Sequence, residues 1–386
     1  HHSFVILKRM TKQKILLSVA AIILGLFTLP ACQTKSGGRD ETGIVSAATP
    51  TPTPIRTKST NDEPITIAAV GDIMLGSTSI YDTFLPPNDG ADILKEMTPV
   101  LSKADITFGN LEGPLLEGGK TEKCAPNATR CFAFRVPTRY GKYLKDAGFD
   151  ILSLANNHAG DFGDYGRQST RKTLDALGIK YAGSDKAQFA IAVLEAKGKR
   201  IAFIGFAHNN IVPNVNDLAF ARQLVEQAKK KADLVVVSFH GGAEGLDQQH
   251  VPNQTEIFGG EARGNLPLFA HTVIDAGADL VIGHGPHVMR GMEIYKDHLI
   301  CYSMGNFATY GMFTLKAETA LTAIFEIKIA ADGKFVGGKL YAGKQPGKGG
   351  PVWDSTGEGI RKVRELSIAD FGTNAPKIAD DGTFTK

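Results

Sequence analysis

The chain has 386 residues, of which 42% are hydrophobic and 22% charged, so it can bury a large core as one big domain or two ordinary ones. Its formal net charge is only +3, and no stripe of Lys and Arg alternates with aromatic residues. This composition indicates a globular protein and argues against nucleic acid as a partner.

The N-terminal residues have the architecture of an export signal. Four basic residues precede an uncharged run of 15 residues, 15–29, which ends in the sequence Leu29-Pro30-Ala31-Cys32. That run is short for a spanning helix, which needs roughly 20 residues, but it suits a cleaved signal. We interpret residues 1–32 as a signal peptide with a lipobox, because Leu29 to Cys32 resembles one. The alternatives are an ordinary secretory signal cut near Ala31 and an uncleaved anchor, and each places the rest of the chain outside the cytoplasm.

The segment 33–63 is rich in Thr, Pro and Ser and has almost no apolar side chains to bury. We interpret it as a disordered tether that begins at a lipid anchor on Cys32. The protein is therefore expected on the cell membrane or outer membrane, facing the periplasm or the exterior. A metal-binding α/β domain is expected over 64–345, followed by a peripheral C-terminal extension over 346–386, where Gly, Lys and Asp are more frequent.

Two cysteines enclose a short polar segment. Cys124 and Cys131 predict a loop disulfide in an oxidising compartment. A zinc site is the alternative, but no further soft ligand stands close in sequence. Cys301 lies in an apolar run and predicts a buried thiol.

In the main domain, six short apolar runs each end at residues able to bind a metal or an anion. The runs are 65–70, 106–108, 151–155, 201–206, 234–239 and 280–282. Helices are expected between them at 140–147, 168–177 and 217–232, and a β-hairpin is expected later at 321–329 and 336–342. This alternation indicates α/β layers, in which ligands bind at the carboxyl ends of the strands. The six polar ends are therefore expected on one rim.

The residues at those ends combine hard oxygens with imidazole nitrogens. They are Asp72, Asn110, Glu112, Asn157, His158, His240, His284 and His287. Mn²⁺, Fe and Zn²⁺ sites use this ligand mixture. In the loop from Gly283 to His287, Gly and Pro restrict the backbone so that both imidazoles can face one ion. The alternative is a polar groove that holds no metal.

At these residues the chain resembles the metallophosphoesterases, whose ligand blocks run Asp-x-His, Gly-Asp, Gly-Asn-His, a lone His and Gly-His-x-His. The resemblance implies a metal-ligand set of Asp72, Glu112 (or Asn110), Asn157, His240, His284 and His287, with His158 as a catalytic residue. Met74 stands where the first block has histidine, and its thioether is a poor ligand for a hard cation. One of the two metal positions is therefore expected to be weakened or lost, leaving one or two ions.

More specifically, residues 65–307 resemble the poly-γ-glutamate capsule synthesis (CapA) family. The matching segments are Val70 to Gly76, Asn110 to Leu115, Leu154 to His158 with Asp161 and Gly163, Ala278 to His287, and Tyr302 to Phe307. This resemblance implies a layered metallophosphatase-like sandwich, with central β-sheets flanked by helices. The chain departs from the family after His240, where Gly-Gly-Ala-Glu replaces the usual Trp-Gly before a glutamate.

Two further residues are candidates for the chemistry. Glu244 is available as an acid or base, or as a partner of a ligand. Arg263 is a candidate for forked binding of a carboxylate or phosphate, and a surface ion pair is its alternative.

The family resemblance implies a cell-surface role in making, attaching or processing poly-γ-glutamate or a similar anionic polymer. Metal-dependent hydrolase or transferase chemistry is expected, with membrane synthase subunits as partners. Two alternatives stay open: a metallophosphoesterase that acts on envelope substrates, and a non-catalytic accessory lipoprotein that binds the polymer or a protein partner. The Gly-x-x-x-x-Gly-Lys-[Ser/Thr] loop is absent from the sequence, which argues against ATP-driven ligation by this chain alone.

Overall fold

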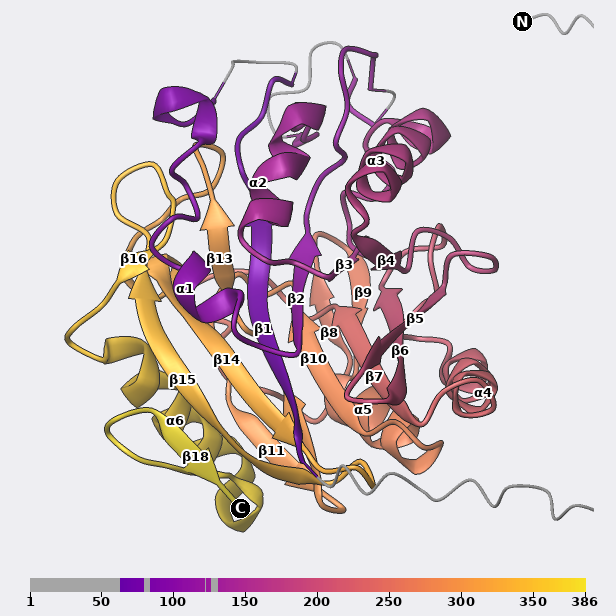
Figure 1. The fold of residues 1–386 in the computed structure, drawn as a ribbon, viewed down its shortest axis with the longest axis vertical. Helices are drawn as coiled ribbons and strands as arrows, with labels where there is room; N and C mark the ends of the chain where they lie inside the picture. The colour runs from indigo at the N-terminus through magenta and orange to yellow at the C-terminus, as the bar shows by residue number, and fades with distance from the viewer. Residues whose placement is uncertain (1–62, 80–83, 122, 126–130) are drawn as a thin grey trace, which may run out of the picture. The chain divides into compact units, whose positions relative to one another are not determined.

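Two β-sheets pack face to face in the computed structural model, which describes residues 63–386 except 80–83, 122 and 126–130 (Figure 1). The predicted signal peptide, Cys32 and the predicted tether up to residue 62 lie outside the described residues. Among the described residues, no helix is long and apolar enough to cross a membrane.

The first sheet is built around β1, with parallel strands on one side and antiparallel strands on the other. Its main path runs β17 (Lys377–Ile378), β18 (Thr383–Thr385), β15 (Phe335–Lys344), β14 (Leu321–Ile329), β1 (Ile65–Met74), β2 (Ile106–Leu111), β3 (Ile151–Ser153) and β4 (Lys180–Ala182). Strand β13 (Asn306–Thr309) pairs with the end of β1, and β16 (Val352–Trp353) pairs with β15. The hairpin β14–β15 confirms the one predicted from sequence.

The second sheet has a parallel centre formed by β6, β7, β10 and β12. Its order is β11 (Met292–Tyr295), β12 (His298–Cys301), β10 (Leu280–His284), β7 (Leu234–His240), β6 (Lys199–Ala207) and β5 (Ile191–Ala196). Strands β8 (Glu256–Phe258) and β9 (Glu261–Gly264) form a separate hairpin, which the sequence analysis did not predict.

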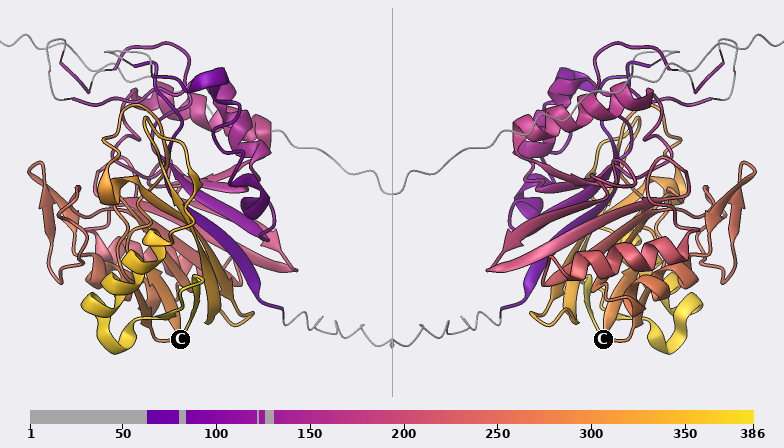
Figure 2. Two further views of the ribbon diagram at one scale, coloured as in Figure 1. Left: turned by 90° about the vertical axis from the view of Figure 1, so that its left-hand side faces the viewer. Right: turned by 90° about the vertical axis from the view of Figure 1, so that its right-hand side faces the viewer.

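Alternate side chains of both sheets fill the space between them, where Phe108 of β2 stacks on Phe203 of β6 with ring centroids 5.6 Å apart. On the outer faces, α1 (Thr98–Leu101), α2 (Gly141–Asp146) and α3 (Gly163–Leu177) cover the first sheet, and α4 (Leu218–Lys229) and α5 (Leu266–Asp275) cover the second (Figure 2). Short 3₁₀ helices lie at Pro87–Gly90, Thr138–Tyr140, Ala317–Ala320 and Gly372–Asn374. The predicted α/β sandwich of central sheets flanked by helices is confirmed.

Two helix ends follow from local chemistry that the sequence displays. Helix α3 stops at Gly178, whose φ of 67° places it in the left-handed region that glycine adopts without steric cost. Helix α4 begins after Asp217, whose side chain accepts a hydrogen bond from the backbone N–H of Phe220.

The C-terminal residues correct the expectation of a peripheral extension over 346–386. Strand β16 pairs with β15, β17 and β18 extend the first sheet, and α6 (Glu358–Phe371) packs against both sheets (Figure 1). The side chains of Val363 and Phe384 are completely buried in the core between the sheets. The tail therefore belongs to the fold, because a few apolar side chains among its charged residues are spaced to reach the core.

Candidate metal centre

The carboxyl ends of the parallel strands meet at one rim, as the sequence predicts, and that rim is shared by two sheets. The amide Nδ2 of Asn110, on β2, lies 3.3 Å from Nδ1 of His240, on β7. Asn209, which follows β6, donates a hydrogen bond from Nδ2 to the carbonyl of Asn156, which follows β3, at 2.9 Å. Contacts such as these join residues of the two sheets into one cluster.

Asp72 reaches the cluster because β1 packs tightly against the segment before β13. The backbone N–H of Asp72 donates to the Gly305 carbonyl at 2.9 Å, and a Cβ atom on Gly71 would lie only 1.9 Å from that oxygen. Asn110 then donates from Nδ2 to Oδ1 of Asp72 at 2.8 Å. Asn110 therefore holds Asp72 in place, and Glu112 is the residue of its block that points its charge into the cluster.

Glu112 lies at the centre of the arrangement. Its Oε1 is 3.7 Å from Nε2 of His158, 3.9 Å from Nε2 of His240 and 3.7 Å from Nε2 of His287. These separations are too long for hydrogen bonds. They are close to the roughly 3.4 Å that separates two ligands bound at about 2.1 Å to one tetrahedral ion.

The two imidazoles of the Gly283–His287 loop enter the cluster differently. Nε2 of His284 lies 3.1 Å from the Val70 carbonyl, which leaves Nδ1 buried and without a partner. A ligating histidine commonly donates its second ring N–H to a backbone carbonyl in this way. Nδ1 of His287 lies 3.0 Å from Oδ2 of Asp72 and 3.1 Å from Oδ1 of Asn306. His287 has a φ of 60°, a left-handed conformation that non-glycine residues adopt rarely and often at functional sites.

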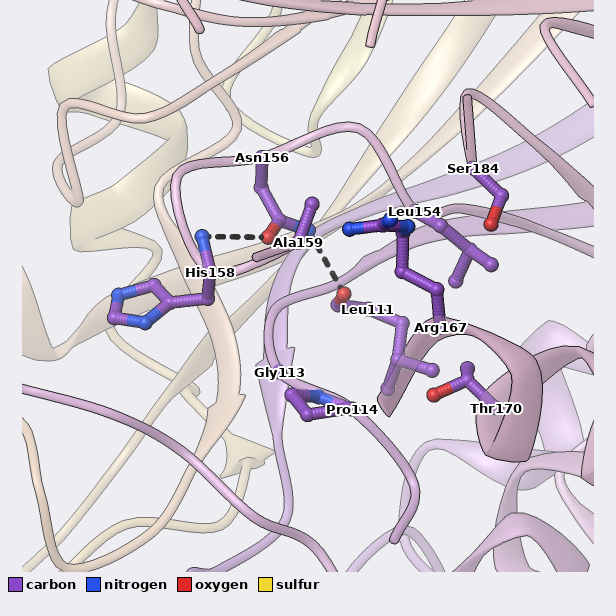
Figure 3. Close-up of a pocket in the computed structure, with 10 residues that line it drawn as sticks. All are labelled: Leu111, Gly113, Pro114, Leu154, Asn156, His158, Ala159, Arg167, Thr170 and Ser184. Atoms are coloured by element: carbon purple, nitrogen blue, oxygen red, sulfur yellow. Dashed lines mark hydrogen bonds between the residues drawn. The ribbon is translucent and has the colours of Figure 1, made fainter. Parts of the chain in front are cut away.

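Three residues of the loop after β3, Asn156, Asn157 and His158, have different roles. Asn156 donates from Nδ2 to the Leu111 carbonyl, and its Oδ1 accepts the backbone N–H of His158 (Figure 3). In the same view the His158 ring points away from Asn156. Oδ1 of Asn157 is buried with no hydrogen-bond partner. Asn156 therefore shapes the loop, and Asn157 is the asparagine whose oxygen is free to bind a cation.

His158 is held by neighbours on two sides. Its Nδ1 lies 2.7 Å from Oδ2 of Asp161, and its ring stacks on Phe134 with centroids 4.0 Å apart. Oδ2 of Asp161 also accepts the backbone N–H of Phe134, and Oδ1 accepts a charged hydrogen bond from Lys123. Because Asp161 holds Nδ1, Nε2 of His158 faces Glu112 and is the ring nitrogen left for proton transfer.

The predicted ligands contribute most of the buried polar atoms that lack hydrogen bonds in the part of the chain that the structure describes. Ten side-chain atoms are of this kind, and six of them are Asp72 Oδ2, both oxygens of Glu112, Asn157 Oδ1, His240 Nε2 and His284 Nδ1. Of these six, Asp72 Oδ2 does have an ion-pair contact, at 3.0 Å from Nδ1 of His287. Each such atom costs about 1–3 kcal/mol when it has no partner. A divalent cation would satisfy them together, and the donor set of oxygens and imidazoles fits Mn, Fe or Zn.

Burial and neighbouring charges shift the protonation states of the cluster: His240 and His284 are favoured in their neutral forms, whereas Glu112 and His287 are favoured in their protonated forms. Burial lowers the pKa of His240 well below its ordinary value and lowers the pKa of His284, so both rings are neutral and keep a lone pair for a cation. Burial also raises the pKa of Glu112 well above its ordinary range. For His287, burial acts to lower the pKa, but the charges of Glu112 and Asp72 outweigh it and raise the pKa to about 10. A cation at this point would replace the proton on His287.

A pocket of about 440 Å³ opens beside the cluster. Its lining includes His158, His287, Glu244, Arg263, Lys123, Phe134, Phe258 and Phe313. Cys131 also lines it, and the predicted disulfide between Cys124 and Cys131 is confirmed. The described residues next to this disulfide, Lys123, Phe132 and Phe134, therefore form part of one wall, which brings aromatic and basic side chains next to His158.

Two predicted residues have roles that the sequence did not define. Arg263 lines the pocket and is paired with two carboxylates: Nη1 donates to Oε1 of Glu244 at 2.8 Å, and Nη2 lies 3.3 Å from Oε2 of the exposed Glu261. Only 5% of Arg263 is exposed. Met74, predicted to be a non-ligand, packs in the core beneath α1 and α2.

Sequence reasoning missed two groups of residues around the centre. Lys123 precedes the disulfide-closed loop and Phe134 follows it, and their distance in sequence from His158 gave no signal. The buried pair of Glu256 and Arg290, whose Nη1 and Nη2 donate to the two carboxylate oxygens at 2.8 and 2.7 Å, was also missed. The three-residue spacing of His158 and Asp161 is the signal that could have assigned Asp161.

Comparisons of the sequence with a family model and with two relatives agree with the resemblance to the capsule synthesis family. Residues 66–310 match the family model described as bacterial capsule synthesis protein PGA_cap. The PGA biosynthesis protein CapA of Bacillus subtilis is 31% identical over 296 residues, covering 72% of each chain. The capsule biosynthesis protein CapA of Bacillus anthracis is 30% identical over 284 residues, covering 68% of this chain and 64% of that one. Among solved structures, a purple acid phosphatase from yellow lupin aligns with 11% identity and a TM-score of 0.36, over 74% of this chain and 52% of its own.

Proposed function

The chain belongs to the family of bacterial capsule synthesis proteins described as PGA_cap, and from that membership we propose that it processes or attaches an anionic capsule polymer through a divalent-metal centre. The polymer class we propose is poly-γ-glutamate or a close relative. The reaction we propose is hydrolysis of its amide bond or transfer of the acyl group. The observation that carries this proposal is the set of partnerless, buried ligand atoms beside a pocket that also contains a positioned histidine.

Asp72, Glu112, Asn157, His240, His284 and His287 would hold one or two ions of Mn, Fe or Zn. Bound there, a divalent cation would act as a Lewis acid towards an amide or phosphoryl oxygen. Because Asp161 and Phe134 fix the imidazole, Nε2 of His158 can deliver a proton to the leaving group at one place in the pocket. Burial lowers the pKa of His158 and so favours the neutral ring, which can take a proton from the attacking water and then pass it to the leaving group.

We also propose that the protein is exported and anchored to the cell membrane or outer membrane by a lipid on Cys32. The charge pattern of residues 1–32 and the apolar run within them support this proposal. The disulfide between Cys124 and Cys131 is in keeping with an oxidising compartment. From such an anchor the domain would meet the polymer at the surface, together with membrane synthase subunits.

The test is a turnover assay on the full chain, purified in detergent and loaded with Mn²⁺. Poly-γ-glutamate is the first substrate, with new amines and chain length as readouts, and a phosphomonoester is the second. We expect cleavage of the polymer, and a loss of about 10²- to 10⁴-fold in His158→Ala with bound metal retained. Cleavage of the phosphoester alone would replace the proposal with an envelope phosphoesterase. Tight polymer binding with no turnover of either substrate would replace it with an accessory binding role.

A further inference from the structure

Three residues of the cluster form a candidate set of ligands for one cation. A ligand atom from each of Asp72, Glu112 and His287 lies within 4.8 Å of the other two. Both oxygens of Glu112 are completely buried and have no hydrogen-bond partner. These unsatisfied oxygens are an observation separate from the grouping of acidic residues, and they point to a bound cation. The residue that would complete this set by the family pattern is Met74, and it lies in the core.

Glu244 stands next to this incomplete set. Its Oε2 is 4.0 Å from Nε2 of His287, the same nitrogen that faces Glu112. Its other oxygen, Oε1, accepts the charged hydrogen bond from Nη1 of Arg263 at 2.8 Å. Arg263 therefore occupies one oxygen of the carboxylate and leaves the other on the side of the cluster. A ligating carboxylate is commonly oriented by a hydrogen bond to its second oxygen in this manner.

The backbone on both sides of Glu244 is fixed by the surrounding fold. The N–H of Ala243 donates to Oε2 of Glu256 at 2.9 Å. Both oxygens of Glu256 also accept hydrogen bonds from the fully buried Arg290. On the other side, the N–H of Gly245 donates to the Pro286 carbonyl at 3.1 Å, one residue before His287. These hydrogen bonds fix the position of the Glu244 backbone relative to that of His287.

We propose that Glu244 is a direct ligand of a second divalent cation, held with Asp72, Glu112 and His287, and that it takes the place that Met74 cannot fill. Three carboxylates and one imidazole make this position harder than its neighbour at Asn157, His240 and His284, so Mn²⁺ is the cation it should prefer over softer ions. The inference rests on the metal-dependent function proposed above, and it assigns Glu244 to cation binding where the sequence suggested proton transfer.

The experiment measures Mn²⁺ binding to the full chain in detergent, after removal of metal with a chelator, by calorimetric titration and by electron paramagnetic resonance. We expect two equivalents and a spin-coupled pair in the parent. In Glu244→Gln we expect one equivalent and an uncoupled signal, with affinity for the second ion at least ~10-fold lower. Glu244→Asp, which keeps the charge but shortens the side chain, should weaken the second ion less.

Glu261→Gln is the matched control. Glu261 also pairs with Arg263, at 3.3 Å, and its substitution makes the same change of charge without a contact to His287. The control should bind two ions like the parent. If Glu244→Gln also binds two ions with unchanged affinity, or if the parent binds one ion that Glu244→Gln retains, Glu244 is no ligand while the metal-dependent function stands. If the parent binds no ion at all, the proposed function itself is overturned.

Discussion

Two clusters of buried charged side chains in this protein differ in how many of their polar atoms have hydrogen-bond partners. Arg290 and Glu256 are joined by two hydrogen bonds, and Arg290 adds a third to the Gln248 carbonyl. In the second cluster, Glu112 is equally buried but makes no hydrogen bond, and Asp72, His240 and His284 each keep one atom without a partner. A buried ion pair closed on itself supports structure. A buried cluster whose polar atoms lack hydrogen-bond partners, called the open cluster below, is arranged to bind a cation that the chain itself does not supply.

The largest effect is expected from breaking the closed pair. Arg290→Met removes the only guanidinium that compensates Glu256 among the described residues, and an uncompensated buried carboxylate costs about 3–5 kcal/mol of unfolding free energy. Adding Glu256→Leu to the same chain should restore most of the loss. Urea unfolding of the metal-free protein measures both.

The matched control for this change is Arg364→Met, which breaks the exposed ion pair with Asp380. It should cost less than about 1 kcal/mol. An equally small cost for Arg290→Met would mean that the buried pair is not the closed structural element that its geometry indicates.

The open cluster predicts the opposite behaviour. Glu112→Gln removes a buried carboxyl that makes no hydrogen bond, so the free energy of unfolding of the metal-free protein should change little. Mn²⁺ at 100 times its dissociation constant should stabilise the parent by about 2.7 kcal/mol and the variant by almost nothing. Thermal unfolding with and without the ion checks this. Equal stabilisation of the two proteins would place the cation elsewhere.

Removing the disulfide beside the pocket should lower the stability of the fold by a smaller amount and leave metal binding unchanged. Replacing both Cys124 and Cys131 with serine opens a loop whose ends are 7 residues apart, at a cost of about 2 kcal/mol. Bound metal should not change, because the predicted ligands belong to other segments. Unfolding and metal content are measured on the same preparation, and loss of the ion would show that the disulfide-closed loop holds the centre together.

The smallest effect concerns Asp161, a satisfied carboxylate within the open rim. Burial acts to raise its pKa, but His158 and Lys123 outweigh it and hold the pKa below its ordinary value. A lowered pKa stabilises the fold above the unfolded carboxyl pKa, and that stability is lost as the pH falls through the folded-state pKa. Asp161→Asn should therefore cost about 1.5 kcal/mol at pH 7 and much less near pH 3. A cost that is the same at both pH values would contradict this role.

The sequence was informative where structure and chemistry are both local. Runs such as 65–70 and 234–239 are continuously apolar because they are buried on both faces, and the polar residue that ends each run marks the rim. The left-handed Gly178 and the capping Asp217 are likewise decided by their own neighbours in the chain. From such signals the sandwich, its rim and the set of residues at that rim could all be predicted.

What could not be predicted depends on distant pairing. Nothing near Glu256 indicates that its partner is Arg290, and nothing near Asp161 indicates Lys123, because tertiary packing creates both pairs. The departure after His240 also has a tertiary cause. A Cβ atom on Gly241 would lie 2.7 Å from the Arg263 carbonyl oxygen, so strand β9 occupies the space that a tryptophan at this position would need.

The open cluster has the buried, unpaired ligand atoms that a divalent cation would satisfy. The most direct measurement is the amount of transition metal per chain, by mass spectrometry, in the full-length protein and in His240→Ala. We expect one or two equivalents of Mn, Fe or Zn in the parent and a clear loss in the variant, because the His240 imidazole is completely buried among the other ligands. Two metal-free proteins, even after incubation with these ions, would contradict cation binding by the open cluster.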